Sequence, residues 1–187
     1  MTIKKIALVG QIRSGKDSVG KMIMEREGHK QFTFAAGIRR IGRDYFPELY
    51  ANPDEKPREL EQFIGQEFRK FDPDVWIKDL KTSLDLEEFM TFSFEEFKPI
   101  VTDMRQENEY HALKALGFTV IKVEADYEIR KQRAIAAGDV FKEEMFNHET
   151  ELAATACPYD HLITNNGTLE ELTEKVESLL KSLKEVS

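Results

Sequence analysis

A glycine-rich loop at residues 10–18 carries the side chains best suited to binding an anion. Gly10 ends the apolar run 6–9, and four spacer residues separate it from Gly15 and Lys16, where an amphipathic segment begins. This order would aim backbone N–H groups, a helix N-terminus and one ammonium at a single anion. The spacing predicts a phosphate-binding loop for a nucleoside triphosphate. The residues expected to bind it are Gly10, Arg13, Ser14, Gly15, Lys16, Asp17 and Ser18.

One position in this loop departs from the usual pattern. Lys16 is normally followed by a Ser or Thr whose hydroxyl binds Mg²⁺, whereas this chain has Asp17 and only then Ser18. Mg²⁺ accepts one or two carboxylates and keeps several waters. We therefore expect Asp17 to hold the metal directly or through water, which leaves Ser18 to reach a phosphate.

A second acidic and basic pair follows the β-branched segment 99–103. Asp103 and Arg105 are two residues apart, so their side chains would point the same way at the carboxyl end of a strand. Asp103 could hold Mg²⁺ through water or accept a proton, and Arg105 could grip an anionic substrate. The alternative is a salt bridge at the end of the strand.

Arg130 and Arg133 lie three residues apart on one face of a predicted helix. Arginines on a mobile element would exclude water and neutralise the charge of a transferring phosphoryl group, so we interpret this helix as part of a lid. The alternative is an ordinary solvated face.

Further arginines could hold the phosphate of an acceptor substrate by bidentate contacts. They are Arg39, Arg40, Arg58 and Arg69. Asn166 follows a predicted strand, and we place it beside the adenine of the triphosphate, although Asn-Gly is first of all a turn signal.

The elements that must position these residues alternate along the chain. Apolar periodicity predicts strands at 3–9, 31–35, 99–103, 118–123 and 162–164. It predicts helices at 17–27, 37–46, 58–71, 74–89, 107–116, 126–137 and 141–154, and a last one after a Thr168/Glu171 capping box. We interpret the phenylalanines of the stretch 86–97 as partner-packing residues and its acidic residues as solvated. The alternation predicts an α/β fold with a parallel sheet.

Composition limits the classes of function. The 187 residues carry a net charge of −8 and one cysteine, and no apolar run is long enough for a membrane span. The acidic balance argues against a nucleic-acid polymer as partner. The start Met1–Lys5 leaves no room for a signal peptide, and a single cysteine suits a reducing compartment, so we expect a cytoplasmic protein. We expect nucleotide substrates and no membrane partner, and we leave a homodimer open.

Four segments of the sequence form a distinctive set. They are the loop Gly-x4-Gly-Lys-Asp-Ser, Phe-Thr-Phe-Ala at 32–35, Thr-Asp-Met-Arg at 102–105 with Asn108-Glu109, and Ile-Thr-Asn-Asn-Gly-Thr at 163–168. Together they resemble a known family, the bacteriophage-type deoxynucleoside monophosphate kinases. The Gly-Lys-Asp variant is also similar to animal phosphomevalonate kinase and, more distantly, dephospho-coenzyme A kinase.

The resemblance implies a three-layer P-loop kinase fold with a five-stranded parallel sheet. It implies one domain over 1–187, with an acceptor-binding insertion at about 36–97 and a lid at about 126–155, and it implies Mg²⁺ and ATP as cofactors. Lys16, Asp103, Arg105, Arg130 and Arg133 would be catalytic, with a nucleoside monophosphate as acceptor. Two alternatives remain, a kinase of another phosphorylated small molecule and an ATPase that regulates a protein partner.

Overall fold

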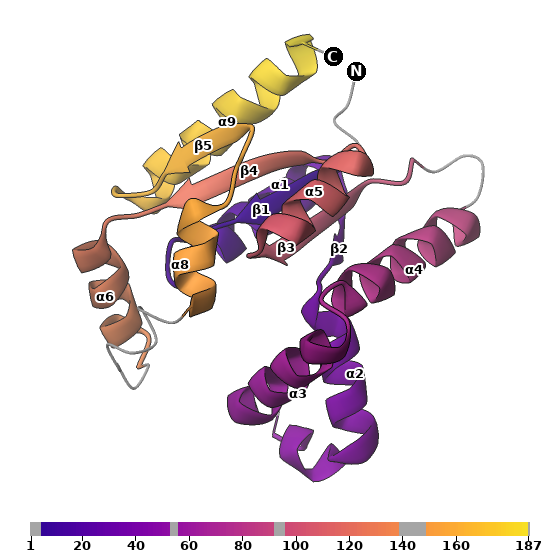
Figure 1. Cartoon of the computed structure of the whole chain (residues 1–187). Coiled ribbons are helices and arrows are strands. Elements are labelled where there is room, and N and C mark those ends of the chain that lie inside the picture. Colours follow the sequence, from indigo (N-terminus) through magenta and orange to yellow (C-terminus); the bar gives the residue numbers. More distant parts are fainter. Residues whose placement is uncertain (1–4, 53–55, 92–95, 139–148, 187) are drawn as a thin grey trace. The chain divides into compact units, whose positions relative to one another are not determined.

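The computed structural model contains a five-stranded sheet in the order β2-β3-β1-β4-β5 (Figure 1). The structure describes residues 5–52, 56–91, 96–138 and 149–186. The strands are β1 (Ile6–Val9), β2 (Lys30–Phe32), β3 (Pro99–Met104), β4 (Thr119–Glu124) and β5 (His161–Thr164). The pairs β1–β3, β1–β4 and β4–β5 are parallel, and Ile6 lies opposite Ile100 on one side and Thr119 on the other. The predicted five-stranded parallel sheet is therefore confirmed.

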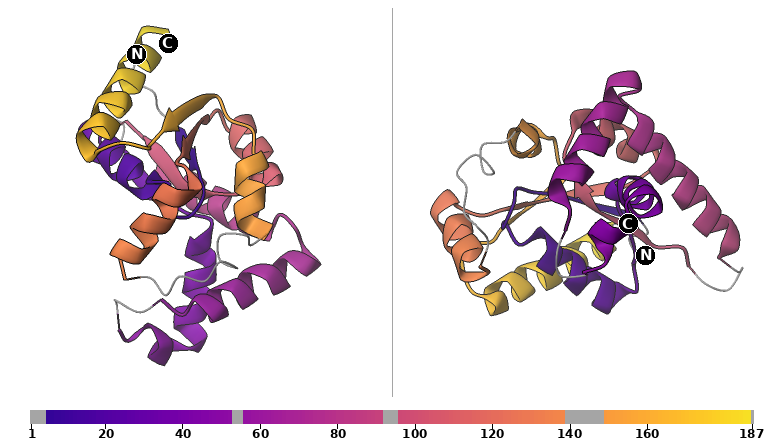
Figure 2. Two further views of the ribbon diagram at one scale, coloured as in Figure 1. Left: turned by 90° about the vertical axis from the view of Figure 1, so that its left-hand side faces the viewer. Right: turned by 90° about the horizontal axis from the view of Figure 1, so that it is seen from below.

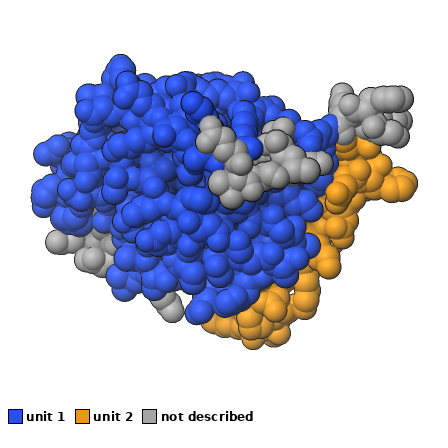
Figure 3. Space-filling model, turned by 90° about the horizontal axis from the view of Figure 1, so that it is seen from above, with its two compact units in different colours: residues 1–31, 95–187 blue, residues 32–94 orange. Residues whose placement is uncertain are grey.

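The chain divides into two compact units, coloured separately in Figure 3. Unit 1 consists of residues 1–31 and 95–187, and unit 2 of residues 32–94. The helices of unit 1 are α1 (Lys16–Glu27), α5 (Glu107–Ala115), α6 (Tyr127–Ala136), α8 (Glu149–Ala156) and α9 (Leu169–Val186). Those of unit 2 are α2 (Ala35–Tyr45), the 3-10 helix Pro47–Tyr50, α3 (Arg58–Phe71) and α4 (Val75–Met90).

Unit 1 has three layers, with α1 and α9 on one face of the sheet and α5 and α8 on the other (Figure 2). The main core lies on the α1/α9 face, where strand residues alternate in and out of it. Ile6 and Leu8 of β1 meet Val19 and Ile23 of α1, and Val176 of α9 joins them. This packing fixes the start of α1 directly behind the carboxyl end of β1.

In the described part of unit 2 the regular elements are helices apart from the end of β2, and its core surrounds the one tryptophan of the chain. Trp76 stacks on Phe68 at 5.6 Å between ring centroids, and its Nε1 donates to the Gly65 carbonyl at 3.1 Å. By contrast, Phe89 near the end of α4 is 88% exposed, so it does not pack within the described chain. Phe92 and Phe94 lie outside the described residues.

The predicted helices and strands agree with the observed ones to within a few residues at each end. The capping box is present, since Glu171 N donates to Thr168 Oγ1 and Thr168 N to Glu171 Oε2. The largest difference concerns the predicted strand 31–35, because β2 ends at Phe32 and α2 begins at Ala35. Ala36 N already donates to the Thr33 carbonyl at 3.2 Å, so the chain turns into the helix there. The part of the predicted helix 141–154 before Glu149 lies outside the described residues.

Among the described helices, we find none that combines the length and the apolar character needed to cross a membrane.

Candidate phosphate-binding site

The loop between β1 and α1 has a backbone that only some residues adopt easily. Gly15, the N-cap of α1, has φ +96°, and Arg13 has φ +60°. Ser14 N donates to the Gln11 carbonyl at 3.1 Å, which closes a turn inside the loop. The N-cap makes no side-chain hydrogen bond to the first turn of α1. The first N–H groups of the helix are therefore available to an anion.

Both glycines of the motif have close neighbours that exclude a side chain, and Gly15 is also favoured by its left-handed conformation. A Cβ at Gly10 would lie 2.5 Å from the Val123 carbonyl oxygen and 2.8 Å from Ser14 Oγ. A Cβ at Gly15 would overlap the carboxamide nitrogen of Asn165. The loop thus leaves no room for a side chain at either glycine.

Lys16, Asp17 and Ser18 form the first turn of α1. The Lys16 ammonium lies 3.3 Å from Asp17 Oδ1, and the Lys16 side chain is 11% exposed whereas that of Asp17 is 91% exposed. Ser18 is exposed. A lysine held at the helix N-terminus next to an accessible carboxylate can bind a phosphate and a hydrated cation side by side.

The loop also presents a hydroxyl that the described residues leave without a partner. Ser14 is 1% exposed, and its Oγ has no hydrogen-bond partner in the described part of the chain. A buried hydroxyl usually finds a partner, so an anion with oxygens at this position would remove the deficit. The donor set of Ser14, Lys16 and the helix N-terminus therefore fits a phosphate group.

Asn165, directly after β5, joins this loop to α6. Its Nδ2 donates to the Ser14 carbonyl at 2.8 Å, and its Oδ1 accepts from Arg133 Nη2 at 3.2 Å. The predicted residue Asn166 is exposed, and its side-chain oxygen accepts from Asp126 N just before α6. Asn165, which the sequence analysis did not select, is thus the residue that contacts the loop.

Arg130 is buried in α6, which contradicts the solvated-face alternative for this residue. It is 5% exposed, its Nε donates to the Ala125 carbonyl at 3.1 Å, and its guanidinium lies 5.8 Å from the Tyr127 ring centroid. Burial lowers the pKa of the Arg130 guanidinium, and the nearby Glu151 carboxylate opposes that change. The cation is therefore held at a fixed place next to Ala125 and Tyr127 rather than on a free surface.

The carboxyl end of β3 supplies a further cation. Arg105 Nη1 lies 2.7 Å from Glu151 Oε1 of α8, and Arg105 N donates to Glu109 Oε2 at 2.8 Å. The other Glu151 oxygen accepts from Ile12 N, inside the loop, at 2.6 Å. Asp103 is partly buried, one residue before the end of β3. Glu151 therefore connects Arg105 to the loop, a link that sequence reasoning missed.

The predicted acceptor-binding arginines lie in unit 2. The Arg40 guanidinium donates a hydrogen bond to the Asp79 carboxylate, which raises the pKa of Arg40. Arg39 Nε lies 3.6 Å from Glu61 Oε1. Arg69 Nη1 donates to the Gly65 carbonyl at 3.3 Å, and Arg58 is exposed at the start of α3. Arg39 and Arg40 thus come from one helix, and Arg58 and Arg69 from another.

Within the described residues, no group of three or more His, Cys, Asp or Glu side chains could form a metal site by itself. Mg²⁺ does not need such a group, since it is bound by one or two carboxylates together with phosphates and water. The exposed Asp17 carboxylate fits that mode of binding.

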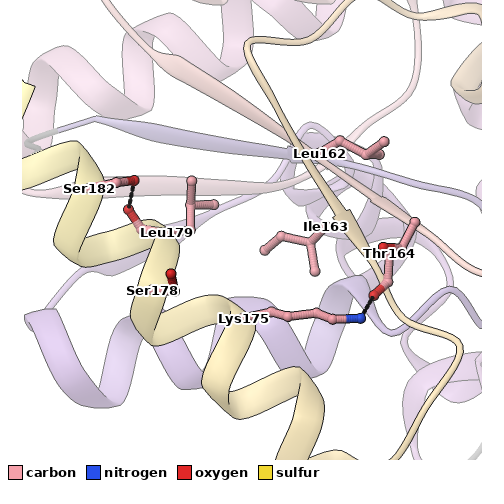
Figure 4. A pocket seen from close by; sticks show the side chains of 7 residues that line it. All are labelled: Leu162, Ile163, Thr164, Lys175, Ser178, Leu179 and Ser182. Carbon is pink, nitrogen blue, oxygen red and sulfur yellow. Dashed lines mark hydrogen bonds between the residues drawn. The ribbon is translucent and has the colours of Figure 1, made fainter.

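A pocket between β5 and α9 is lined by other residues (Figure 4). Leu162, Thr164 and Lys175 line it, and the Lys175 ammonium donates to the Thr164 carbonyl at 2.7 Å. None of the predicted site residues lines it.

The parallel sheet and the loop before α1 define a P-loop protein. Residues covering 98% of this chain and 99% of the other superpose on TT1252 from Thermus thermophilus with a TM-score of 0.61 at 20% identity. A gluconokinase from Sinorhizobium meliloti matches with a TM-score of 0.54 at 15% identity, over 98% of this chain and 94% of that one. At such identities these similarities concern the fold alone.

Sequence comparison is more specific. A family model described as deoxynucleotide monophosphate kinase matches residues 58–176. Deoxynucleotide monophosphate kinase of Enterobacteria phage T4 is 31% identical over 175 residues, which cover 91% of this chain and 63% of that protein. The enzyme of Escherichia phage RB69 is 31% identical over 126 residues, covering 66% of this chain and 44% of that protein. The chain belongs to the deoxynucleotide monophosphate kinase family, and it spans less than two thirds of the length of these two relatives.

Proposed function

We propose that this protein transfers the γ-phosphoryl group of Mg·ATP to a deoxynucleoside monophosphate and releases the diphosphate. The observation that supports this most strongly is the family match over residues 58–176. The phosphate loop at 10–18 lies outside that match and supports phosphoryl transfer independently. The names of the two phage relatives point to deoxynucleotide monophosphates as acceptors.

In this proposal the triphosphate lies at the start of α1. Lys16 and the first N–H groups of the helix would bind its β- and γ-phosphates, and the Ser14 hydroxyl would donate to one of the phosphate oxygens. Arg13, Gly10 and Gly15 shape the loop around it. Asn166, exposed after β5, would lie beside the adenine.

Asp17 and Asp103 would hold Mg²⁺, largely through water. The cation would supply charge neutralisation between the β- and γ-phosphates. The phosphate group of a nucleoside monophosphate has a second pKa of about 6, so its attacking oxygen is already mostly deprotonated at neutral pH. Asp103 therefore has no proton to accept from this acceptor, and metal binding is the role that we retain for it.

The arginines would neutralise the charge that phosphoryl transfer spreads over the equatorial oxygens. Arg105, Arg130 and Arg133 all come from unit 1, from the end of β3 and from α6. Phosphoryl transfer depends mainly on positioning and electrostatic stabilisation, so arginines fixed by neighbours are more effective than mobile ones. In unit 2, Arg39, Arg40, Arg58 and Arg69 would bind the acceptor phosphate.

The test measures diphosphate formation from Mg·ATP with a panel of deoxy- and ribonucleoside monophosphates. We expect one or more deoxynucleotides to be converted. Lys16→Ala should lower kcat/KM by about 10²- to 10³-fold, since a cation at the transferring phosphate is lost. Lys21→Ala is the control, because Lys21 is on the same helix with its side chain 74% exposed.

Two outcomes would contradict the proposal. ATP hydrolysis at one rate whatever the acceptor would indicate an ATPase that acts on a protein partner. Product formed only from dephospho-coenzyme A or phosphomevalonate would indicate a kinase of another phosphorylated small molecule.

A further inference from the structure

Glu151 is a buried carboxylate between two parts of the site. It lies on α8 and is 3% exposed. One of its oxygens accepts the Ile12 N–H at 2.6 Å, and the other lies 2.7 Å from Arg105 Nη1. Ile12 is in the phosphate loop, and Arg105 follows β3. One side chain thus links two segments that bind different parts of the proposed reactants.

Because Glu151 is buried, its carboxylate is held rigidly as well as closely against Ile12 and Arg105. An ionised carboxylate away from water is strongly unfavourable unless hydrogen bonds and opposite charge compensate for it. Here each oxygen has its own donor, and the Arg130 cation interacts with the same carboxylate. Removal of the carboxylate would leave the Ile12 N–H and the Arg105 guanidinium without this acceptor.

The helix that carries Glu151 is itself anchored on the sheet. The Lys122 ammonium of β4 donates to the Thr155 carbonyl at 2.6 Å, and Cys157 Sγ lies 3.8 Å from the Gln106 carbonyl oxygen just before α5. Thr155 Oγ1 also donates to the Glu151 carbonyl at 3.0 Å. Glu151 therefore approaches the loop from a fixed support.

We infer that Glu151 is a positioning residue for phosphoryl transfer, which holds the Arg105 guanidinium at a fixed orientation beside the phosphate loop. The inference rests on the proposed function. A planar guanidinium paired with a carboxylate loses much of its rotational freedom, so it is ready for charge that develops in the transition state. Glu151 acts through Arg105 and is not itself expected to contact the reactants.

A Glu151 carboxylate that only competed with phosphate for Arg105 would have a different effect on binding. Its removal would then increase the affinity for substrate. If it positions Arg105, its removal lowers kcat and leaves the KM for ATP nearly unchanged, because Lys16 and the start of α1 still bind the triphosphate.

The first experiment compares Glu151→Gln with Glu27→Gln. Glutamine keeps the shape of the side chain but replaces one acceptor oxygen with a donor, so the contact with Arg105 or with Ile12 is lost. Glu27, the last residue of α1, is a matched control. Its side chain is 13% exposed, and its Oε1 lies 2.7 Å from the Lys184 ammonium. We expect Glu151→Gln to lower kcat about 10- to 100-fold, and Glu27→Gln to leave kcat unchanged.

A double-mutant cycle with Arg105→Lys separates positioning from a general loss of stability. If Glu151 acts through Arg105, Glu151→Gln should have little further effect on kcat in the Arg105→Lys background. Additive effects on kcat, or tighter binding of substrates by Glu151→Gln, would overturn the inference.

A spectroscopic measurement tests the ion pair without reference to activity. In the nitrogen NMR spectrum at low temperature, the Arg105 guanidinium should give separate, slowly exchanging Nη signals, assigned by their loss in Arg105→Lys. They should disappear in Glu151→Gln and persist in Glu27→Gln. Absence of these signals from the unmodified protein would overturn the inference, whereas absence of diphosphate formation alone would contradict only the proposed function.

Discussion

Two glycines at the ends of α1 have similar backbones and different surroundings. Gly15 before the helix has φ +96°, and Gly28 after it has φ +71°. A Cβ at Gly15 would overlap the Asn165 carboxamide, whereas a Cβ at Gly28 would meet nothing within 4 Å. Alanine substitutions at the two glycines can therefore be compared. Both include the free-energy cost of the left-handed conformation, and only the substitution at Gly15 also crowds the phosphate loop.

We predict that Gly28→Ala lowers the free energy of unfolding by about 1 kcal/mol, since alanine is strained in the left-handed region. Its affinity for ATP should stay within about twofold of the unmodified value. Gly15→Ala should lose more stability than Gly28→Ala, because the carboxamide of Asn165 must also move away from Ser14, and it should bind ATP at least about tenfold more weakly. Urea unfolding and calorimetric titration with Mg·ATP measure the two effects. Equal ATP affinities in the two variants would contradict the proposed role of this loop.

Residues of the site could be predicted from the sequence where the determinants are local. Lys16 and both glycines lie within seven positions, so their spacing alone predicts a loop and a helix N-terminus. Glu151 could not be found in this way, because it is 139 residues from Ile12 in the chain. Asn165 and Asn166 are adjacent, and only the direction of the chain after β5 decides which one faces the loop.

At the scale of elements, Asp160 fixes the start of β5. Its backbone N donates to the Val120 carbonyl at 2.9 Å, and its carboxylate accepts from Val120 N at 2.8 Å and from the Lys114 ammonium at 2.7 Å. Burial would raise the pKa of the Asp160 carboxyl, but the bonds from Lys114 and Val120 outweigh it and lower that pKa. The strand β5, the strand β4 and the end of α5 are therefore joined at one side chain.

We predict that Asp160→Ala lowers the free energy of unfolding by about 1–2 kcal/mol at pH 7, because it removes both hydrogen bonds. A lowered pKa in the folded state means that the ionised carboxylate stabilises the fold above its ordinary pKa of 3.8 and loses this effect as pH falls through the lowered value. The difference between the unmodified protein and the variant should therefore be constant from pH 7 to about pH 5 and shrink below pH 4. Urea unfolding at several pH values measures it, and a difference that grew on acidification would contradict this account.

Elements were predicted well where one face is buried. The predicted helix 58–71 coincides with α3, because its apolar residues repeat at the spacing of a helix. The stretch 31–35 was predicted as a strand because it alternates polar and apolar residues. Phe34 is nevertheless 3% exposed at the N-cap of α2, so helix packing overrides local preference there. Phe89 shows the converse, an apolar residue at helical spacing that is not packed within the described chain.

At the scale of the whole molecule, the two units have cores of different size. The buried apolar residues of unit 2 form a small group, namely Phe34, Ile38, Ile64, Trp76, Leu80 and Leu84. Unit 1 contains the sheet and most of the other buried apolar residues. Units of about 60 residues bury a smaller fraction of their surface than larger ones and are less stable. Since Trp76 is the one tryptophan of the chain, its fluorescence reports on unit 2 alone.

We predict that unit 2 unfolds at lower urea concentration than unit 1. Trp76 fluorescence should change first, while the far-UV circular dichroism of the sheet and its helices persists to higher urea. Mg·ATP at about 100 times its Kd should stabilise unit 1, which contains Lys16, by about 2.7 kcal/mol. It should therefore move the later transition to higher urea and leave the Trp76 transition in place. If both probes change together and ATP shifts them equally, the chain unfolds as one cooperative body, and the difference in core size has no separate effect on stability.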